Sequence, residues 1–142
     1  MNFLLDTNVV SEWVKPRPNV NVVRWLADSD EDRVYLSVIT FAEIHHGIEE
    51  MHAGRRRDAL ISWLHDDLAA RFGDRVLDVN MLVAKTLGAV MAQSRLKGVN
   101  LGVSDGFIAA TAISHELTLV TRNKKHFERL NLPVLNPWRE ME

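Results

Sequence analysis

The sequence contains no cysteine, which excludes disulfide bridges and thiolate-bound zinc from the features that stabilise this protein. It also has no apolar run near the roughly 20 residues that a membrane-spanning helix needs. The apolar stretch at the start of the chain lacks a basic flank and is interrupted by Asp6, unlike a secretory signal. Together these absences predict a cytoplasmic protein with no membrane segment.

A strong excess of one charge is missing as well. The formal net charge is -2, and charged residues make up 25% of the chain. No global positive field therefore attracts a polyanion such as nucleic acid. If the protein acts on one, local basic groups or a bound metal ion must hold it.

The length and composition fit one globular domain covering residues 1–142. A chain of 142 residues with 46% hydrophobic content is long enough to build its own core. No internal repeat, low-complexity segment or long linker divides it. Short apolar runs alternate with helical stretches, a pattern typical of the α/β class, in which helices cover both faces of a parallel sheet.

The same pattern predicts where the elements lie. The expected strands are Phe3–Leu5, Val34–Val38, Arg75–Val79, Leu117–Thr121 and Val134–Leu135. The expected helices are a short one from Asn8, one capped by Asn19, one from about Thr40, one over Arg55–Phe72, one capped by Asn80 and ending at Lys97, one capped by Ser104 and ending near His115, and one over Lys124–Leu130. Gly98 is a suitable left-handed residue after the long helix.

Four polar residues fall at one expected edge of this sheet. Asp6 and Asn123 come at or just after the carboxyl ends of two strands. Glu43 and Asp105 are expected in the first turns of helices, which begin near that same edge. Because open α/β sheets bind ligands there, we expect these side chains to converge although they are far apart in the sequence.

Carboxylates that converge in this way favour metal chemistry. They repel one another unless a cation shares their charge. Their oxygens suit Mg²⁺ or Mn²⁺, which complete their coordination with water and substrate phosphate. Such an ion activates water and stabilises a leaving oxygen, so the pattern indicates metal-assisted hydrolysis of a phosphodiester bond.

Each of these residues also has a structural explanation. Asp6 could begin an Asx turn, and Thr40 with Glu43 forms a capping-box pattern. Asp105 could favour a helix dipole, and Asn123 could be a turn residue. Spacing and periodicity do not decide between the structural and the functional interpretation.

Four segments, in this order along the chain, resemble a known protein family, and this resemblance decides in favour of the functional interpretation. They are LLDTNVVSE at 4–12, LSVITFAEIHHGIEE at 36–50, VSDGFIAATAISHELTLVTRNKKHFERL at 103–130 and VLNPW at 134–138. These segments resemble a PIN domain, and more narrowly the VapC and FitB toxins of bacterial toxin–antitoxin pairs. The resemblance runs from Phe3 to Trp138 and so covers nearly the whole chain.

The resemblance implies a fold and a site. The fold would be a three-layer α/β/α PIN domain with a central parallel five-stranded sheet of order 3-2-1-4-5. The acids of the Asp-Thr-Asn, Thr-x-x-Glu and Asp-x-x-Ile-Ala-Ala motifs correspond to Asp6, Glu43 and Asp105. They would form the catalytic set and bind Mg²⁺, with Mn²⁺ as a substitute.

The resemblance also implies roles for the residues around these acids. Asn123 corresponds to a fourth catalytic position at which several relatives carry Asp. A neutral side chain there leaves open whether one or two metal ions bind. Thr7, Asn8 and Thr121 would hydrogen-bond to the residues that bind the metal.

The implied activity is that of a toxin, a Mg²⁺-dependent endoribonuclease with RNA as its substrate. A cognate antitoxin of the VapB or FitA type would occupy the acidic groove, with an Arg against Asp6 and Asp105, and would supply any contact with DNA. The family also suggests a homodimer. Part of its surface could come from a stripe on the long helix: Leu82, Leu87, Val90, Met91 and Ser94.

Two other functions remain open at this stage. A FitB-like chain could serve mainly as one subunit of a DNA-binding toxin–antitoxin complex, with weak or no nuclease activity. A phosphatase of the haloacid-dehalogenase type would use the strand-end Asp6 as a nucleophile. Such enzymes place a second acid two residues later, where this sequence has Asn8.

Overall fold

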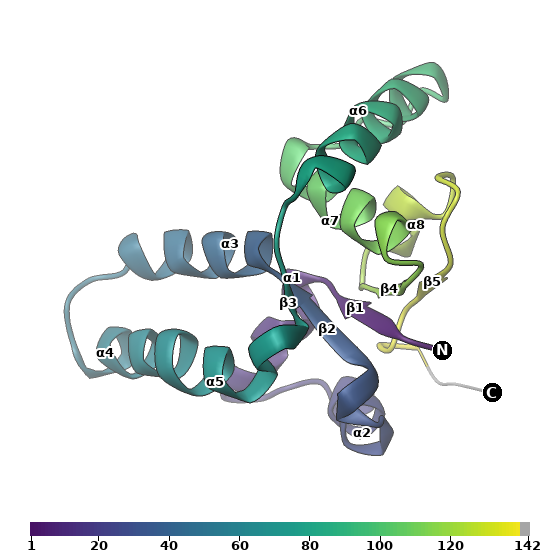
Figure 1. Cartoon of the computed structure of the whole chain (residues 1–142). Helices are drawn as coiled ribbons and strands as arrows, with labels where there is room; N and C mark the ends of the chain where they lie inside the picture. The colour runs from purple at the N-terminus through teal and green to yellow at the C-terminus, as the bar shows by residue number, and fades with distance from the viewer. Residues whose placement is uncertain (140–142) are drawn as a thin grey trace.

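A parallel sheet forms the centre of the molecule in the computed structural model, which describes residues 1–139 (Figure 1). Its strand order is β3-β2-β1-β4-β5, and every neighbouring pair is parallel. The predicted α/β class and strand order are therefore confirmed. Two strands have the predicted bounds: β1 (Phe3–Leu5) and β5 (Val134–Leu135). Three are shorter than predicted: β2 (Val34–Ser37), β3 (Val76–Leu77) and β4 (Thr118–Val120).

Helices connect these strands. They are α1 (Thr7–Val10), η1 (Ser11–Val14), α2 (Val20–Asp28), η2 (Glu31–Arg33), α3 (Val38–Glu49), α4 (Arg55–Ser62), η3 (Trp63–Leu68), α5 (Ala69–Phe72), η4 (Gly73–Arg75), α6 (Met81–Leu96), α7 (Val103–Ser114) and α8 (Lys124–Phe127). None of those found in residues 1–139 is long and apolar enough to cross a membrane.

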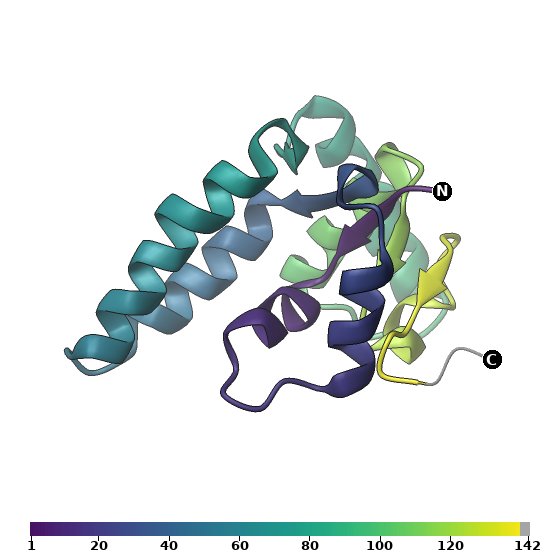
Figure 2. The same ribbon diagram turned by 90° about the horizontal axis from the view of Figure 1, so that it is seen from below.

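Successive residues of the central strands face two separate cores, because side chains alternate along a strand. Leu5 and Val120 point into a core shared with α2, α3 and the α4–α5 run. Leu4 and Leu119 point into a second core formed with α6, α7 and α8. The helices thus cover both faces of the sheet, as predicted. Figure 2 shows α2 lying across one face, and a long hairpin of α3 with α4, η3 and α5 extending beyond the sheet.

Two helices begin earlier than predicted, and this moves Glu43. Helix α3 is capped by Ser37, whose hydroxyl accepts from the Ile39 N–H at 3.0 Å. The capping box proposed for Thr40 and Glu43 is therefore wrong, and Glu43 lies in the second turn of α3 rather than the first. Helix α7 likewise follows Gly102 and not a Ser104 cap. The error at α3 arises because the strong N-cap residue Ser37 lies inside the segment predicted as a strand, and the error at α7 arises because Gly102 is a weaker N-cap signal than Ser104.

Other predicted boundaries changed less. The caps at Asn19 and Asn80 are confirmed, as is a left-handed Gly98 with φ of 68°. The short helix after β4 ends at Phe127 instead of Leu130. The expected helix over 55–72 is continuous, but its middle third, η3, has π-helical hydrogen bonding. Its apolar stripe does face the core, where Leu64, Leu68 and Phe72 are buried.

The stripe predicted as a dimer surface on α6 is mostly used inside the chain, so that prediction is wrong. Val90 and Ser94 are buried. A methyl group on Gly106 of α7 would lie 2.8 Å from Met91 Sδ and 2.9 Å from Leu87 Cδ1, so these side chains pack over the glycine. Of the five residues, Leu82 alone is largely exposed. The stripe holds α6 against α7 and thereby fixes the helix that carries Asp105.

A buried carboxylate orders the loop between η1 and α2. Glu12 is 2% exposed, its Oε1 accepts from the Asn19 N–H at 2.8 Å, and its Oε2 pairs with Lys15. Burial raises the pKa of Glu12, but the bonds from Lys15 and Asn19 and the charges of Lys15 and Arg122 outweigh burial and lower it overall. Glu12 is therefore ionised and structural.

We predict that Glu12→Ala lowers the free energy of unfolding by about 1 to 3 kcal/mol, because it leaves the Asn19 N–H without its partner. Denaturant unfolding at pH 7 measures the change. Glu128→Ala, at an exposed glutamate of the same charge, serves as the control and should change stability by less than about 0.5 kcal/mol. Equal effects of the two variants would contradict this role of Glu12.

Candidate active site

Asp6 is fixed where β1 ends and α1 begins. Its N–H donates to the carbonyl of Val120 at 2.9 Å, which continues the pairing of β1 with β4. Its Oδ1 accepts from the N–H of Thr7 at 2.8 Å and caps α1. The expected turn role of Asp6 is thus present, but it uses only one carboxylate oxygen.

The other oxygen of Asp6 lies against the end of β4. Oδ2 accepts from the Thr121 hydroxyl at 2.8 Å, and the Asn8 amide nitrogen lies 3.5 Å from it. The Asn8 Oδ1 in turn accepts from the Arg122 N–H at 3.3 Å. These bonds tie the carboxyl ends of β1 and β4 together and hold the Asp6 carboxylate in one orientation.

Glu43 joins this network from α3. The Thr7 hydroxyl donates to Glu43 Oε1 at 2.8 Å and lies 3.0 Å from the hydroxyl of Thr40. Thr40 is fully buried, and sequence reasoning gave it only a capping role. The Thr-x-x-Glu spacing could have indicated that Thr40 belongs to the site, because it places the side chains of Thr40 and Glu43 on one side of α3. The second-turn position of Glu43 brings it to Thr7, so the error in the helix start does not remove Glu43 from the site.

The electrostatics of Asp6 show that the three acids lie near one another. Asp6 is 4% exposed. Burial raises its pKa from about 3.8 to about 6, hydrogen bonds from Thr121 and Thr7 oppose that rise, and the negative charges of Asp105 and Glu43 add to it. A carboxylate in this position is ionised near neutral pH only at a cost in free energy.

Asp105 and Asn123 occupy the rim. Asp105 lies in the first turn of α7; partial burial raises its pKa, and the nearby His126 lowers it. Nothing in the sequence pattern connected His126 with Asp105. Asn123 is exposed, and its backbone N–H donates to the Thr121 hydroxyl at 3.0 Å. The side chain of Asn123 forms no hydrogen bond with residues 1–139, so its backbone rather than its amide belongs to the network.

The donor set fits a divalent cation, although the side chains do not enclose one as they stand. Within residues 1–139, no three carboxylate or imidazole groups are arranged to hold a single ion. Mg²⁺, however, commonly uses only one or two carboxylates and fills its shell with water and phosphate. Asp6, Asp105 and Glu43 supply hard oxygen donors, and their mutual repulsion is what a cation would relieve.

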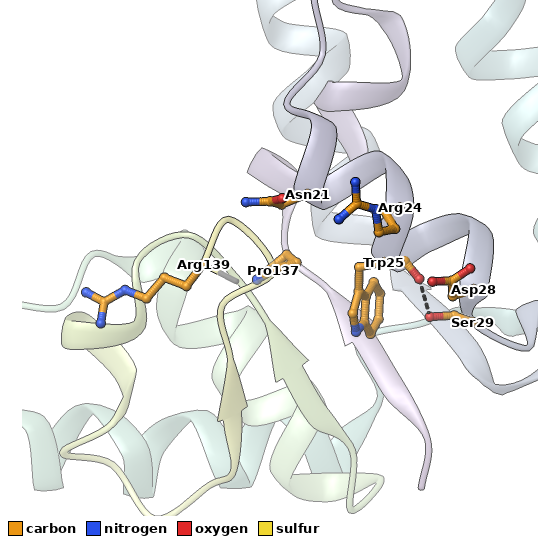
Figure 3. Close-up of a pocket in the computed structure, with 7 residues that line it drawn as sticks. All are labelled: Asn21, Arg24, Trp25, Asp28, Ser29, Pro137 and Arg139. Atoms are coloured by element: carbon orange, nitrogen blue, oxygen red, sulfur yellow. Dashed lines mark hydrogen bonds between the residues drawn. The ribbon is translucent and has the colours of Figure 1, made fainter. Parts of the chain in front are cut away.

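A cleft of about 520 Å³ lies elsewhere, between α2 and the C-terminal segment. Figure 3 shows the indole of Trp25 at its centre, with Pro137 and Ser29 beside it and Arg139 extending away. None of the three acids lines it. A smaller cleft, of about 230 Å³, is lined by Asn123 and His126 among others, and none of the three acids lines it either.

Residues 3–132 match the model of the PIN domain. The chain belongs to the PIN-domain family. This finding agrees with the sheet order.

Several members of this family are similar over almost their whole length. The chain is 40% identical to the plasmid stability protein StbB of Pseudomonas syringae, with 95% of this chain and 97% of that one covered. It is 36% identical to Y4jK, a VapC ribonuclease of Sinorhizobium fredii, with coverage of 95% and 96%. It is 36% identical to the toxin FitB of Neisseria gonorrhoeae, with coverage of 96% and 99%. The solved structure of FitAB bound to the IR36 DNA fragment has 34% identity, coverage of 99% and 98%, and a TM-score of 0.93.

The raised pKa of Asp6 predicts that Asp6→Asn stabilises the metal-free protein near neutral pH. The folded state binds the Asp6 proton more tightly than the unfolded state, so stability falls as pH rises from about 3.8 to about 6 and stays lower above that. We expect the variant to exceed wild type by about 1 to 3 kcal/mol at pH 7 in EDTA, and by much less below pH 4.

Denaturant unfolding at both pH values measures this difference. Adding Mg²⁺ should stabilise wild type and leave Asp6→Asn nearly unchanged, since only an ion that binds the folded site shifts the equilibrium. A variant that is less stable than wild type at pH 7 in EDTA would show that the Asp6 carboxylate is not under electrostatic strain.

Proposed function

We propose that this protein is a Mg²⁺-dependent endoribonuclease that acts as the toxin of a toxin–antitoxin pair. The observation that carries the proposal is the buried Asp6 carboxylate, whose pKa is raised by burial and by the charges of Asp105 and Glu43. Similar chains named as a VapC ribonuclease and as the toxin FitB support the same activity. Asp6, Asp105 and Glu43 would hold the metal ion.

The chain's own residues would fix the geometry of this site before substrate arrives. Asp6, Asp105 and Glu43 would hold a divalent ion, which would supply an activated water and offset charge on the leaving oxygen. Thr121 and the Thr7 N–H hold one orientation of Asp6. The Thr7 hydroxyl occupies Oε1 of Glu43 and leaves Oε2 available. This preorganisation avoids reorganising the carboxylates during the reaction.

Asp105 and Asn123 would face the substrate side of the site. Burial raises the pKa of Asp105, and the His126 imidazole opposes that rise and so favours the ionised carboxylate that a cation requires. Asn123 would present a neutral amide where a fourth acid would add another metal ligand. We therefore assign Asn123 to substrate or water contact and not to the principal metal ion.

An antitoxin is the proposed protein partner. The chain superposes on the FitAB–DNA structure with a TM-score of 0.93, which supports an assembly of the same kind. A C-terminal antitoxin segment that placed an Arg against Asp6 and Asp105 would satisfy both carboxylates and displace the metal. DNA would be bound through that partner, because the toxin chain has a net charge of -2. A homodimer of the toxin chain is proposed as the unit that the antitoxin binds.

Cleavage of total RNA tests the proposed activity. Wild type freed of any partner should produce discrete fragments with Mg²⁺ or Mn²⁺ and none with EDTA. Asp6→Ala and Asp105→Asn should each lower the rate by about a hundredfold or more, because each removes charge from the metal site. Absence of cleavage by folded wild type that still binds Mg²⁺ would favour the DNA-binding complex as the main role of the chain.

Thr7 offers a test of preorganisation with a matched pair of variants. Thr7→Val keeps the shape but removes the hydroxyl that donates to Glu43, so kcat should fall about tenfold with little change in KM. Thr7→Ser keeps the hydroxyl and should retain most of kcat. Steady-state cleavage of one labelled RNA gives both constants. Equal losses in the two variants would rule out the hydroxyl as the cause.

A further inference from the structure

A basic cleft lies on the segment that follows β4 and at the end of β5. Its walls carry Arg122, Asn123, Lys124, Lys125, His126, Asn136 and Arg139, and its volume is about 230 Å³. Four of these residues are lysine or arginine, whereas the whole chain has a net charge of -2. The cations are therefore concentrated where the global charge gives no reason to expect them.

Hydrogen bonds join this basic cleft to the Asp6 network. The Arg122 N–H donates to Asn8 Oδ1, and the Asn123 N–H donates to the Thr121 hydroxyl that also holds Asp6. His126, which also lines the cleft, is close enough to Asp105 for its charge to act on that carboxylate. Residues of the cleft are thus linked to the acids at both Asp6 and Asp105.

The C-terminal Asn-Pro-Trp motif positions Arg122. The Arg122 guanidinium lies over the Trp138 ring, with its carbon 5.4 Å from the ring centroid. Asn136 bridges the two residues: its Nδ2 donates to the Arg122 carbonyl at 3.4 Å, and its Oδ1 accepts from the Trp138 N–H at 3.0 Å. Stacking of this kind restricts an exposed arginine and leaves its N–H groups free for a partner.

Three cations of the cleft form no ion pair among the residues that the structure describes up to position 139. They are Arg122, Lys124 and Lys125, whereas Arg71 and Arg57 do form such pairs. The charge of Arg122 acts on the Glu12 carboxylate, but that carboxylate is paired with Lys15. An acid site also repels the phosphates of an approaching polyanion, so binding needs positive charge next to it.

From this arrangement we infer that the basic cleft binds a backbone phosphate of the RNA substrate, next to the phosphate that is cut, with Arg122 as its positioned anchor. The inference rests on the proposed ribonuclease function and assigns the path of the substrate away from the acids. Arg122 would bind one phosphate through its N–H groups, and Lys124 and Lys125 would add point charges along the strand. The Asn-Pro-Trp motif would then support substrate binding through Arg122.

Binding of a fluorescent single-stranded RNA, measured by anisotropy at several salt concentrations, tests this inference. The Asp6→Asn background prevents cleavage during the measurement. The test variants are Arg122→Ala and the pair Lys124→Ala with Lys125→Ala. The control pair, Lys85→Ala with Arg95→Ala, removes the same charge from exposed positions on α6.

We expect the lysine pair to raise Kd about tenfold at low salt and to reduce the slope of log K against log salt by about 1.4, for two lost phosphate contacts. Arg122→Ala should raise Kd about tenfold. Arg122→Lys should raise Kd by less, because lysine keeps the positive charge but lacks the planar guanidinium that stacks on Trp138. The control pair should change Kd less than twofold. Losses in the control that match those of the test variants would overturn the inference, as would no loss in any variant.

Two further results separate this inference from the proposed function. If the wild-type protein cuts no RNA but binds it in a way that depends on the basic cleft, phosphate binding by the cleft is supported and the proposed nuclease activity is rejected. If the protein cuts RNA with metal but no cleft variant changes KM, the nuclease activity is supported and phosphate binding by the cleft is rejected. A labelled polyglutamate peptide that bound as tightly as RNA, with the same losses, would reassign the cleft to acidic protein segments.

Discussion

The structure depends on one constraint: the Asp6 carboxylate is buried where β1 and β4 end. A backbone N–H, a hydroxyl and an amide surround it, and no cation within residues 1–139 is among its hydrogen-bond partners. Two further acids lie near enough to raise its pKa. A fold selected only for stability would not keep such a group ionised, because burial and like charges both disfavour the charged form. The arrangement is understandable if the carboxylate is kept ready for a cation that comes with the substrate.

The surrounding elements serve that one position. The Thr7 hydroxyl links the turn after Asp6 to Glu43, and Asn8 links it to Arg122 on the other side. Close packing of Met91 and Leu87 over Gly106 fixes α7 and so the neighbouring Asp105. The C-terminal segment completes the site from outside, since Asn136 and Trp138 hold Arg122 at the basic cleft. The Asp6 carboxylate and Arg122 are thus both held by contacts near the end of β4.

Much of the fold could be predicted from the sequence, because burial patterns report it directly. Short apolar runs give the five strands, and the caps at Asn19 and Asn80 mark two helix starts. The convergence of Asp6 and Glu43 follows from the common edge of parallel strands.

Chemical roles did not follow from spacing, because Asp6 both caps α1 and belongs to the acid site. The α6 stripe was misread for a similar reason: an apolar helix face indicates burial, but not whether the neighbour is another helix or another chain. His126 and the basic cleft depend on contacts between segments that no local pattern reports.

The most direct measurement is the ionisation of Asp6 itself, followed through its carboxyl carbon by NMR across a pH titration, with and without Mg²⁺. The account predicts a pKa of about 6 in the metal-free protein, and a value well below that when the ion is bound. A pKa near 3.8 in the metal-free protein, unchanged by saturating Mg²⁺, would contradict it, because the buried carboxylate would then have no electrostatic strain for a cation to relieve.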